Sequence, residues 1–404
     1  MIWDDLIGQN PAKTYLRLAL NSHRLAHAYL FSGPPGVGKR TAAYAFAHAA
    51  MCHAPPSPDV ACGVCKSCRW FAARKGASIE HPDMIPLINI TIRRDDQDDR
   101  TIQIEKFVGD HEPVIKLETV QYVCEQLHRS PMAGAKRTLI IPEAQRLCRG
   151  QAESANAFLK TLEEPPKAAL IILTSSQPEA LLETIVSRVQ TVQFKRLSGP
   201  EVAQGLMRRW PNMEPKDVSL LTAMADGSLG RALELLDGDL KAWRANVIAG
   251  LEKFTAATFL LFGSGLWAIA DSEGQRLYEL EKNADDADES EDDDSAAPNP
   301  NADAEAKTAA GWKRHVFIRL LSLCEICFRD GLVSAAADGA ATAPLLQPDR
   351  PELARALGAK FGTYGCEKAL RALREALLAA RLYVRGDIIG RALAGSLREA
   401  LTAA

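Results

Sequence analysis

The sequence lacks any hydrophobic run of the ~18 residues that a membrane-spanning helix requires. Its first residues, Met1–Asp5, do not begin a charged segment followed by an apolar one, so no secretory signal is expected. The sequence therefore predicts a protein of the cytosol with no membrane partner. It also lacks a strong excess of charge, since the formal net charge is −3. This net charge excludes a protein that binds nucleic acid through overall positive charge, although it is compatible with a local basic surface.

Length and composition are those of an ordinary globular protein. The chain has 404 residues, of which 47% are hydrophobic and 25% charged, so two or three domains are expected. Residues 1–197 alternate helical stretches with short apolar runs, which predicts an α/β domain with a parallel sheet. Residues 198–240 predict a small helical domain, and residues 241–404 an all-helical one. The predicted strands are residues 28–31, 138–141, 170–173 and 191–194.

Two charged segments predict loops. The first, near residues 283–308, is an acidic run followed by Ser, Ala, Pro and Asn, with little to bury and no basic residue within its acidic run. It predicts a solvated, disordered loop, with a DNA mimic or an inhibitory tail as the functional alternative. The second, residues 93–100, consists of Arg, Asp and one Gln and predicts a similar loop inside the first domain.

A phosphate-binding loop follows the first predicted strand. The segment Gly33–Lys39 reads G-P-P-G-V-G-K and opens a helix over residues 40–51. Gly33, Gly36 and Gly38 allow a tight turn whose backbone N–H groups face phosphates at the positive end of the helix dipole. Lys39 would reach the outer phosphates. The pattern predicts a nucleotide fold, with ATP or ADP as the ligand.

The residues that hold magnesium at such a site are replaced. Arg40 stands where a Ser or Thr hydroxyl ligates Mg²⁺, and Pro142 stands where an Asp does. Glu143, which would polarise the attacking water, remains. The sequence therefore predicts no Mg²⁺ site and no hydrolysis. Two alternatives stay open: the loop is retained only as part of the fold, or it binds nucleotide without hydrolysing it.

Four cysteines form the most specific metal pattern. Cys52, Cys62, Cys65 and Cys68 lie within one Pro-rich segment, with two C-x-x-C steps. Zinc takes four thiolates tetrahedrally, and short steps let the turns aim the sulfurs at one ion. The pattern predicts a closed, structural zinc site rather than a catalytic one. Reduced core thiols are the alternative, and His53 is an alternative ligand.

Several segments together resemble bacterial sliding-clamp loaders of the AAA+ class. The resemblance covers about residues 1–240 and depends on the four-Cys insertion after the phosphate-loop helix and on the following segments: Ile7–Gln9, His27–Pro34, His81–Asp83, Ser154–Pro166 and Thr184–Val189. It implies a RecA-like domain, a helical lid and a helical collar that joins a ring. Because the magnesium motifs are degraded, the sequence resembles the delta-prime type of subunit more than the motor type. The implied partners are the tau/gamma and delta subunits, the beta clamp and primed DNA.

The resemblance also assigns roles to three further residues. Arg188 matches the arginine that reaches a neighbouring subunit's nucleotide, where such a finger is worth ~10³-fold or more in rate; the alternative is a surface ion pair. Thr174 matches the first sensor and Arg231 the second, with a helix cap and a solvated charge as their alternatives. Val189 departs from the family's Cys after the arginine.

Three functions follow from these patterns. The first is a non-hydrolysing clamp-loader subunit that donates Arg188 to a neighbouring ATPase. The second is an ATP-hydrolysing motor subunit of the same loader, favoured by Lys39 and Glu143. The third is a zinc-dependent DNA-binding or regulatory module, favoured by the four cysteines, although no basic recognition helix follows them.

Overall fold

The protein is described by a computed structural model, which divides into two compact units. One consists mainly of Met1–Gly205 with Ser228–Gly230, and the other mainly of Leu206–Gly227, Arg231–Ala296 and Ala304–Ala404. Each unit is considered by itself below. The described residues are 3–22, 25–72, 74–75, 78–79, 81–86, 90–95, 98–106, 115, 117–148, 152–236, 239–288, 308–336, 345–382 and 384–402.

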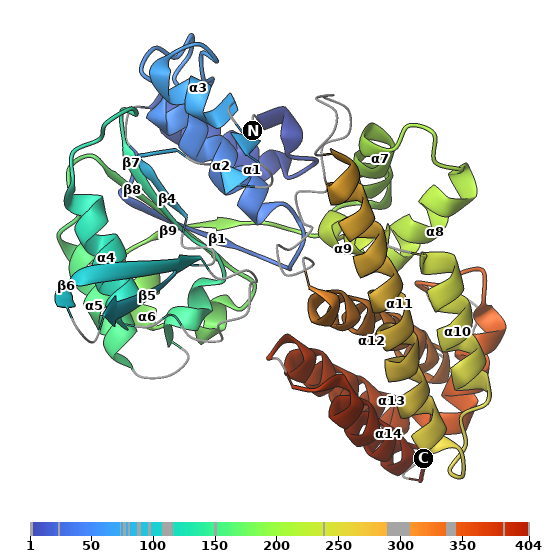
Figure 1. Ribbon diagram of the computed structural model, residues 1–404. Helices are drawn as coiled ribbons and strands as arrows, with labels where there is room; N and C mark the ends of the chain where they lie inside the picture. The colour runs from blue at the N-terminus through green and yellow to red at the C-terminus, as the bar shows by residue number, and fades with distance from the viewer. Residues whose placement is uncertain are drawn as a thin grey trace. The chain divides into compact units, whose positions relative to one another are not determined.

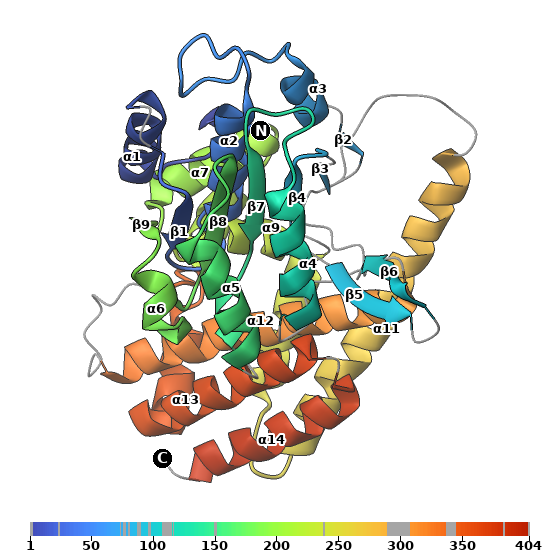
Figure 2. The ribbon, with the colours of Figure 1, turned by 90° about the vertical axis from the view of Figure 1, so that its left-hand side faces the viewer.

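A five-stranded parallel sheet forms the centre of the first unit (Figure 2). Its strands, in spatial order, are β4 (Met84–Pro86), β7 (Arg137–Ile141), β8 (Ala169–Ser175), β1 (Ala28–Ser32) and β9 (Gln190–Gln193). Four of the five strands lie where the sequence predicts them, within one or two residues at each end. The predicted α/β class is confirmed, and β4 escaped prediction because three residues are too few to show a period.

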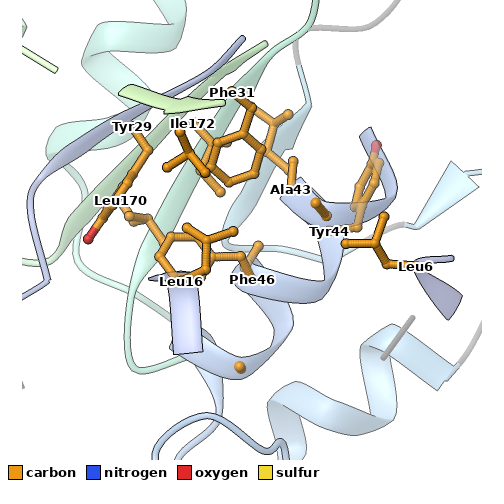
Figure 3. Packing of buried hydrophobic residues seen from close by; sticks show 14 of the residues in the cluster. Leu6, Leu16, Tyr29, Phe31, Ala43, Tyr44, Phe46, Leu170 and Ile172 are labelled. Atoms are coloured by element: carbon orange, nitrogen blue, oxygen red, sulfur yellow. The ribbon is translucent and has the colours of Figure 1, made fainter. Parts of the chain in front are cut away.

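The central strands are buried on both faces, which explains their continuous apolar runs. Alternate residues of β1 enter opposite cores: Tyr29 and Phe31 belong to one cluster, Ala28 and Leu30 to the other. The first cluster also contains Phe46 of α2 (Lys39–Met51), whose ring lies 4.9 Å from that of Tyr29 (Figure 3). The two cores fix the register of the strands and hence the loops at their carboxyl ends.

Helices cover both faces of this sheet (Figure 1). The first core packs against α1 (Asn10–Asn21) and α2, and the second against α4 (Leu117–His128) and α5 (Ala152–Glu163). The remaining short elements are the 3₁₀ turns Trp3–Asp5, Ala144–Cys148 and Pro178–Ala180, the helices α3 (Lys66–Ala72) and α6 (Glu183–Val186), and the strands β2 (Arg74–Lys75) and β3 (Ser78–Ile79).

The prediction of a loop at residues 93–100 is wrong for most of this segment. The structure has an antiparallel strand pair there, β5 (Ile90–Asp95) and β6 (Asp98–Lys106), with Ile92 opposite Ile104. Ile and Thr recur on both sides of the charged segment, and these β-branched residues favour strands. The prediction weighed the charges and overlooked the alternation that flanks them.

The remaining described elements are all helices, as predicted. Its helices are α7 (Gly199–Arg209), α8 (Pro215–Ala225), α9 (Leu229–Leu236), α10 (Leu240–Glu252), α11 (Phe259–Asp288), α12 (Ala309–Ala336), α13 (Pro351–Arg381) and α14 (Gly386–Thr402). Of the predicted acidic loop, the part up to Asp288 continues α11, and residues 289–307 lie outside the described residues. Among the helices described, none combines the length and the apolar character that crossing a membrane requires.

Aromatic side chains organise the core of the second unit. Phe328 of α12 meets Phe361 of α13 edge-on at 5.0 Å, and Phe317 meets Trp267 of α11 at 5.4 Å. Cys324 and Cys327 are fully buried between them on α12, so this C-x-x-C pair contributes to packing rather than to a metal cluster. A long helical hairpin of this kind supplies a large apolar interior without a sheet.

Candidate functional site

The phosphate loop has the backbone conformation that its glycines predict. It connects β1 to α2, and φ is +150° at Gly33, +70° at Gly36 and +99° at Gly38. These are values that L side chains rarely adopt. A Cβ atom on Gly33 would also lie 2.2 Å from the carbonyl oxygen of Phe194. The loop therefore depends on glycine both for its turn and for its approach to the strand beside it. Helix α2 begins directly after the loop, so its N-terminal end lies beside it.

Lys39 folds back over this loop. Its Nζ donates to the carbonyl oxygens of Gly33 and Pro34 at 2.5 and 2.6 Å, and its side chain is buried. Burial lowers the pKa of Lys39, while the negative charge of Glu143 acts in the opposite direction. An ammonium group has three protons, so one remains to meet a phosphate oxygen.

Neither magnesium position carries a ligand. Arg40 is exposed in the first turn of α2, and Pro142 follows the end of β7. A guanidinium only donates hydrogen bonds, and a proline side chain has no donor or acceptor, so neither can coordinate Mg²⁺. The side chains of Arg40 and Pro142 therefore do not fit a magnesium ion coordinated at these two positions.

Glu143 is held by neighbouring hydroxyl and amide groups. Its Oε2 accepts from Nε2 of Gln145 at 2.5 Å and from Oγ of Ser176 at 2.8 Å. Its backbone lies in the left-handed region, with φ of +48°, and its N–H points at Oγ1 of Thr174 at 3.4 Å. The structure thus brings together the predicted Glu143 and Thr174, at the carboxyl ends of β7 and β8.

Gln145 is the residue that the sequence reasoning missed here. It is 3% exposed, and besides donating to Glu143 it accepts from Oγ of Ser175 at 2.6 Å through Oε1. It therefore joins the ends of β7 and β8 through one amide. Only its position, two residues after Glu143 in a turn, could have drawn attention to it.

The beginning of α9 contacts the phosphate loop. The N–H of Gly230 donates to the carbonyl oxygen of Gly36 at 2.8 Å, and Oγ of Ser228 donates to that of Pro35 at 3.0 Å. A Cβ atom on Gly230 would lie 2.7 Å from Cα of Gly36, so this approach requires glycine. Arg231 comes next, and within the second unit its Nη2 lies 3.6 Å from Oε2 of Glu325 on α12.

Arg188 lies on the surface, just after α6. Its Nη2 pairs with Oε1 of Glu163 at 2.8 Å, and its Nη1 donates to the carbonyl oxygen of Thr184 at 2.9 Å. The two charged side chains are 35% and 50% exposed. Arg188 thus makes the surface ion pair that its alternative interpretation predicts, and its side chain remains accessible from outside the unit.

The four predicted cysteines converge at the other end of α2. All four sulfur atoms lie within 4.8 Å of one another. The separations of Cys52 from Cys65, Cys62 from Cys68, and Cys68 from Cys52 are 3.9, 3.8 and 3.7 Å. A tetrahedral ion with metal–sulfur bonds of ~2.3 Å has sulfur–sulfur edges of about 3.8 Å. A disulfide needs ~2.05 Å, so the arrangement fits a metal site and not a bridge.

Backbone N–H groups donate hydrogen bonds to three of the four sulfur atoms. The N–H groups of Cys62, Cys65 and Cys68 donate to Sγ of Cys52, Cys62 and Cys65 at 3.3, 3.3 and 3.5 Å. Burial opposes ionisation of Cys65, but backbone hydrogen bonds outweigh it and lower its pKa to about 6. Burial raises the pKa of Cys52 and of Cys68. The cluster therefore releases protons when a cation binds.

A buried carboxylate connects this cluster to the sheet. Asp83 accepts from the N–H groups of Met132–Gly134 at 2.6 to 2.7 Å and from Nη1 of Arg137 at 3.2 Å. Nδ1 of His81 accepts from the N–H of Asp83, and its Nε2 lies 3.1 Å from Oγ of Ser67 in α3. Burial lowers the pKa of His81 to about 4, so the ring is neutral. Ser67 lies between two of the cysteines, and the cysteine cluster is thereby held against the domain.

Comparison of the sequence with known proteins finds relatives among the subunits of DNA polymerase III. A family model described as "DNA polymerase III, delta subunit" matches residues 8–198. The DNA polymerase III subunit tau of Bacillus subtilis is 31% identical over 241 residues, which are 58% of this chain and 37% of that protein. The DNA polymerase III subunit delta' of Pseudomonas aeruginosa is 30% identical over 228 residues, 56% of this chain and 61% of that protein.

Residues 8–198 of the chain belong to the DNA polymerase III clamp-loader family. The alignments of this clamp-loader protein span between 37% and 61% of the length of these two relatives. A solved structure of a gamma subunit-related protein from Thermotoga maritima aligns with 96% of the clamp-loader chain and 98% of its own, at 14% identity and a TM-score of 0.42. The relatives include both tau and delta' subunits, so the type of clamp-loader subunit is addressed below.

Proposed function

We propose that this protein is a subunit of the bacterial sliding-clamp loader in DNA replication, which does not hydrolyse ATP itself and supplies Arg188 to a neighbouring ATPase subunit. The observation that carries the proposal is the contrast within one pocket. The loop Gly33–Lys39 keeps its phosphate-binding conformation, while Arg40 and Pro142 occupy the two positions that would hold magnesium. The first domain is then a RecA-like AAA+ domain, followed by a lid at residues 198–240 and a collar at residues 241–404.

The phosphate loop is suited to ATP or ADP as an inert ligand. Gly33, Gly36 and Gly38 shape the loop, and Lys39 has a proton left for a phosphate oxygen. Hydrolysis needs a cation between the β- and γ-phosphates and an oriented water molecule. Arg40 can offset phosphate charge but cannot act as a Lewis acid, because guanidinium offers no vacant coordination position.

Glu143 is poorly placed to act as a base in its present arrangement. One carboxylate oxygen is already occupied by Gln145 and Ser176. Glu143 then serves with Thr174 to close the polar end of the sheet.

Arg188 can leave its present partner at little expense. Ion pairs between exposed side chains contribute only ~0–1 kcal/mol, and the pair with Glu163 is exposed on both sides. A planar cation that enters a neighbour's site can stabilise charge on the γ-phosphate by ~10³-fold or more in rate. A subunit with an inert site can in this way be required for hydrolysis elsewhere in a ring.

The metal at the four cysteines is proposed to be zinc with a structural role. Thiolate ligands at tetrahedral separations are those that Zn²⁺ selects, and four protein ligands leave no open coordination position. Bound zinc would cross-link a segment that has little core of its own. Cys52, Cys62, Cys65 and Cys68 would hold it.

The proposed partners follow from the family. They are the tau/gamma and delta subunits, the beta clamp, and primed DNA reached through the complex. The alternative function is a tau/gamma-type motor subunit, which the retained Lys39 and Glu143 favour and which the tau relatives also support. In that case Arg40 would have to move aside for Mg²⁺.

The decisive experiment measures ATP turnover of the isolated chain and of a loader reconstituted with clamp and primed DNA. We expect the isolated chain to be inert and Arg188→Ala to reduce turnover of the complex by ~10³-fold. Glu163→Gln is the matched control, because it removes the same ion pair and keeps the arginine.

Two results would contradict the proposal. If the isolated chain hydrolyses ATP with Mg²⁺, it is a motor subunit. If Arg188→Ala and Glu163→Gln have equal, small effects on the complex, Arg188 is only a surface ion-pair partner. Assembly of each variant into the complex is verified by size-exclusion chromatography.

A further inference from the structure

Helix α3 has one buried face and one exposed face. Ser67, Cys68 and Phe71 are between 0% and 2% exposed and face the domain. Lys66, Arg69 and Trp70 are exposed on the other side, Trp70 to 42%. A tryptophan normally contributes a large buried area, so its exposure on a well-packed helix calls for a physical explanation.

Two further apolar side chains extend this exposed face. Val64, in the turn between two cysteines, is 70% exposed, and Met132 is 73% exposed. Arg69 Nε donates to the carbonyl oxygen of Val64 at 3.0 Å, and Lys66 Nζ to that of Met132 at 3.4 Å. These five residues, Val64, Lys66, Arg69, Trp70 and Met132, are therefore contiguous and are called the α3 patch below.

The α3 patch rests on a firm base. Phe71 stacks on His48 with ring centroids 4.2 Å apart, and Ser67 contacts His81 at 3.1 Å. On the preceding segment, Trp3 Nε1 donates to the carbonyl oxygen of Asp59 at 2.7 Å. A surface that is already ordered loses little conformational entropy when it binds. This arrangement favours recognition rather than incidental exposure.

The two segments that contain the patch carry charge of one sign. Residues 60–72 and 127–137, which contain it, include no Asp or Glu. The nearest acidic residue in sequence, Asp59, is 4% exposed and already paired with Arg17 at 2.5 Å. Lys66 and Arg69 can therefore pair with carboxylates of a partner. The apolar side chains beside them can pack against apolar side chains of the same partner.

We propose that the α3 patch docks an acidic amphipathic segment of a protein partner, in which Asp or Glu residues alternate with aliphatic or aromatic anchors. Trp, Met and Arg are enriched at protein interfaces and anchor them. Single-stranded nucleic acid instead needs successive stacking rings along a basic groove, and the patch offers one ring. The proposal does not depend on the nucleotide pocket or on Arg188.

The test is selection of binders from a random 12-residue peptide library on the full zinc-loaded chain. Recovered peptides are synthesised and titrated by fluorescence anisotropy. We expect them to be enriched in acidic and large apolar residues. Their affinity should fall at least ten-fold in the variant Val64→Ser/Trp70→Ser/Met132→Ser, and similarly in Lys66→Glu/Arg69→Glu.

The matched controls change the same kinds of residue elsewhere. Leu18→Ser/Met207→Ser removes apolar side chains that are 61% and 54% exposed, and Lys167→Glu/Lys253→Glu reverses exposed charges; both should leave binding unchanged. Zinc content and melting temperature show that each variant is folded. The proposal is overturned if no peptide is enriched, or if binding persists in the patch variants. It is also overturned if the patch variants instead lose binding of a 20-nucleotide oligo-dT probe, which would make this a nucleic-acid surface.

Discussion

Helix α2 begins at the phosphate loop and ends at Met51, directly before Cys52, so its 13 residues join the two candidate sites. At its N-terminus the backbone of a nucleotide site is present, but Arg40 and Pro142 replace the metal-binding side chains. At its C-terminus four sulfur atoms lie at tetrahedral separations. One end keeps the loop conformation without side chains suited to magnesium, and the other brings together four side chains that could hold a metal ion.

The difference is understandable from what each group does for the fold. Gly33 lets the loop pass Phe194, and Lys39 bonds two loop carbonyls, so both stabilise the domain without any ligand. A magnesium ligand at position 40 or 142 would add nothing to packing. The cysteines, in contrast, lie within the packed structure, since Cys52 and Cys68 are 5% and 1% exposed.

Removing the zinc ligands is expected to have the largest effect. Cys65→Ser/Cys68→Ser should abolish stoichiometric zinc, because binding energies of ~10 kcal/mol or more are tied to folding in small zinc modules. Proteolysis of the segment around residues 52–72 should become rapid. Zinc per chain by elemental analysis and limited proteolysis measure this, with Cys324→Ser/Cys327→Ser as the control pair. Undiminished zinc in the first variant would overturn the metal assignment.

Asp83 tests how strongly the cysteine cluster depends on the domain. Asp83→Ala leaves Arg137 buried without its partner and three N–H groups without their acceptor. Breaking a buried pair in this way destabilises by ~3–5 kcal/mol. Chemical denaturation measures the loss. Asp59→Ala, whose partner Arg17 is 50% exposed, should show a much smaller change, and equal changes would contradict the role given to Asp83.

The fold was largely predictable, because the central strands are apolar on both faces and the glycine loop follows one of them. The hairpin β5–β6 was not, since its charged residues obscured the alternation of β-branched ones. Of the candidate sites, the loop and the four cysteines depend on local spacing, which a sequence shows directly.

The partners of site residues were not predictable. Glu163 beside Arg188, Glu325 beside Arg231, and Gln145 beside Glu143 are contacts between separate elements or within an irregular turn. No local pattern encodes them, because each depends on how strands and helices pack. The exposed face of α3 was equally unpredictable, because seven residues are too few to show which side chains of the helix are buried.

Restoring magnesium ligands should make the phosphate loop a metal-dependent site, as the cysteine cluster at the other end of α2 is proposed to be. In the unaltered chain, we expect ATP affinity to be the same within about three-fold with and without Mg²⁺, because neither Arg40 nor Pro142 can ligate the ion. Arg40→Thr/Pro142→Asp should make binding Mg²⁺-dependent by about ten-fold. Titration with a fluorescent ATP analogue, with and without EDTA, measures both. A strong Mg²⁺ dependence of the unaltered chain would contradict the degraded site.

The smallest effect expected is an opposite response of the two sites to pH. Burial lowers the pKa of Lys39 from its ordinary value, so its charge is lost at a lower pH than that of a free lysine. Nucleotide affinity should therefore decrease by a few-fold as pH rises from about 7.5 to 9.5. Zinc affinity should increase over the same interval, because burial raises the pKa of Cys52 and Cys68 and these thiols lose protons on binding. Lys39→Arg, which stays charged, should abolish the first trend and preserve the second; if it preserves both, Lys39 does not meet the phosphate.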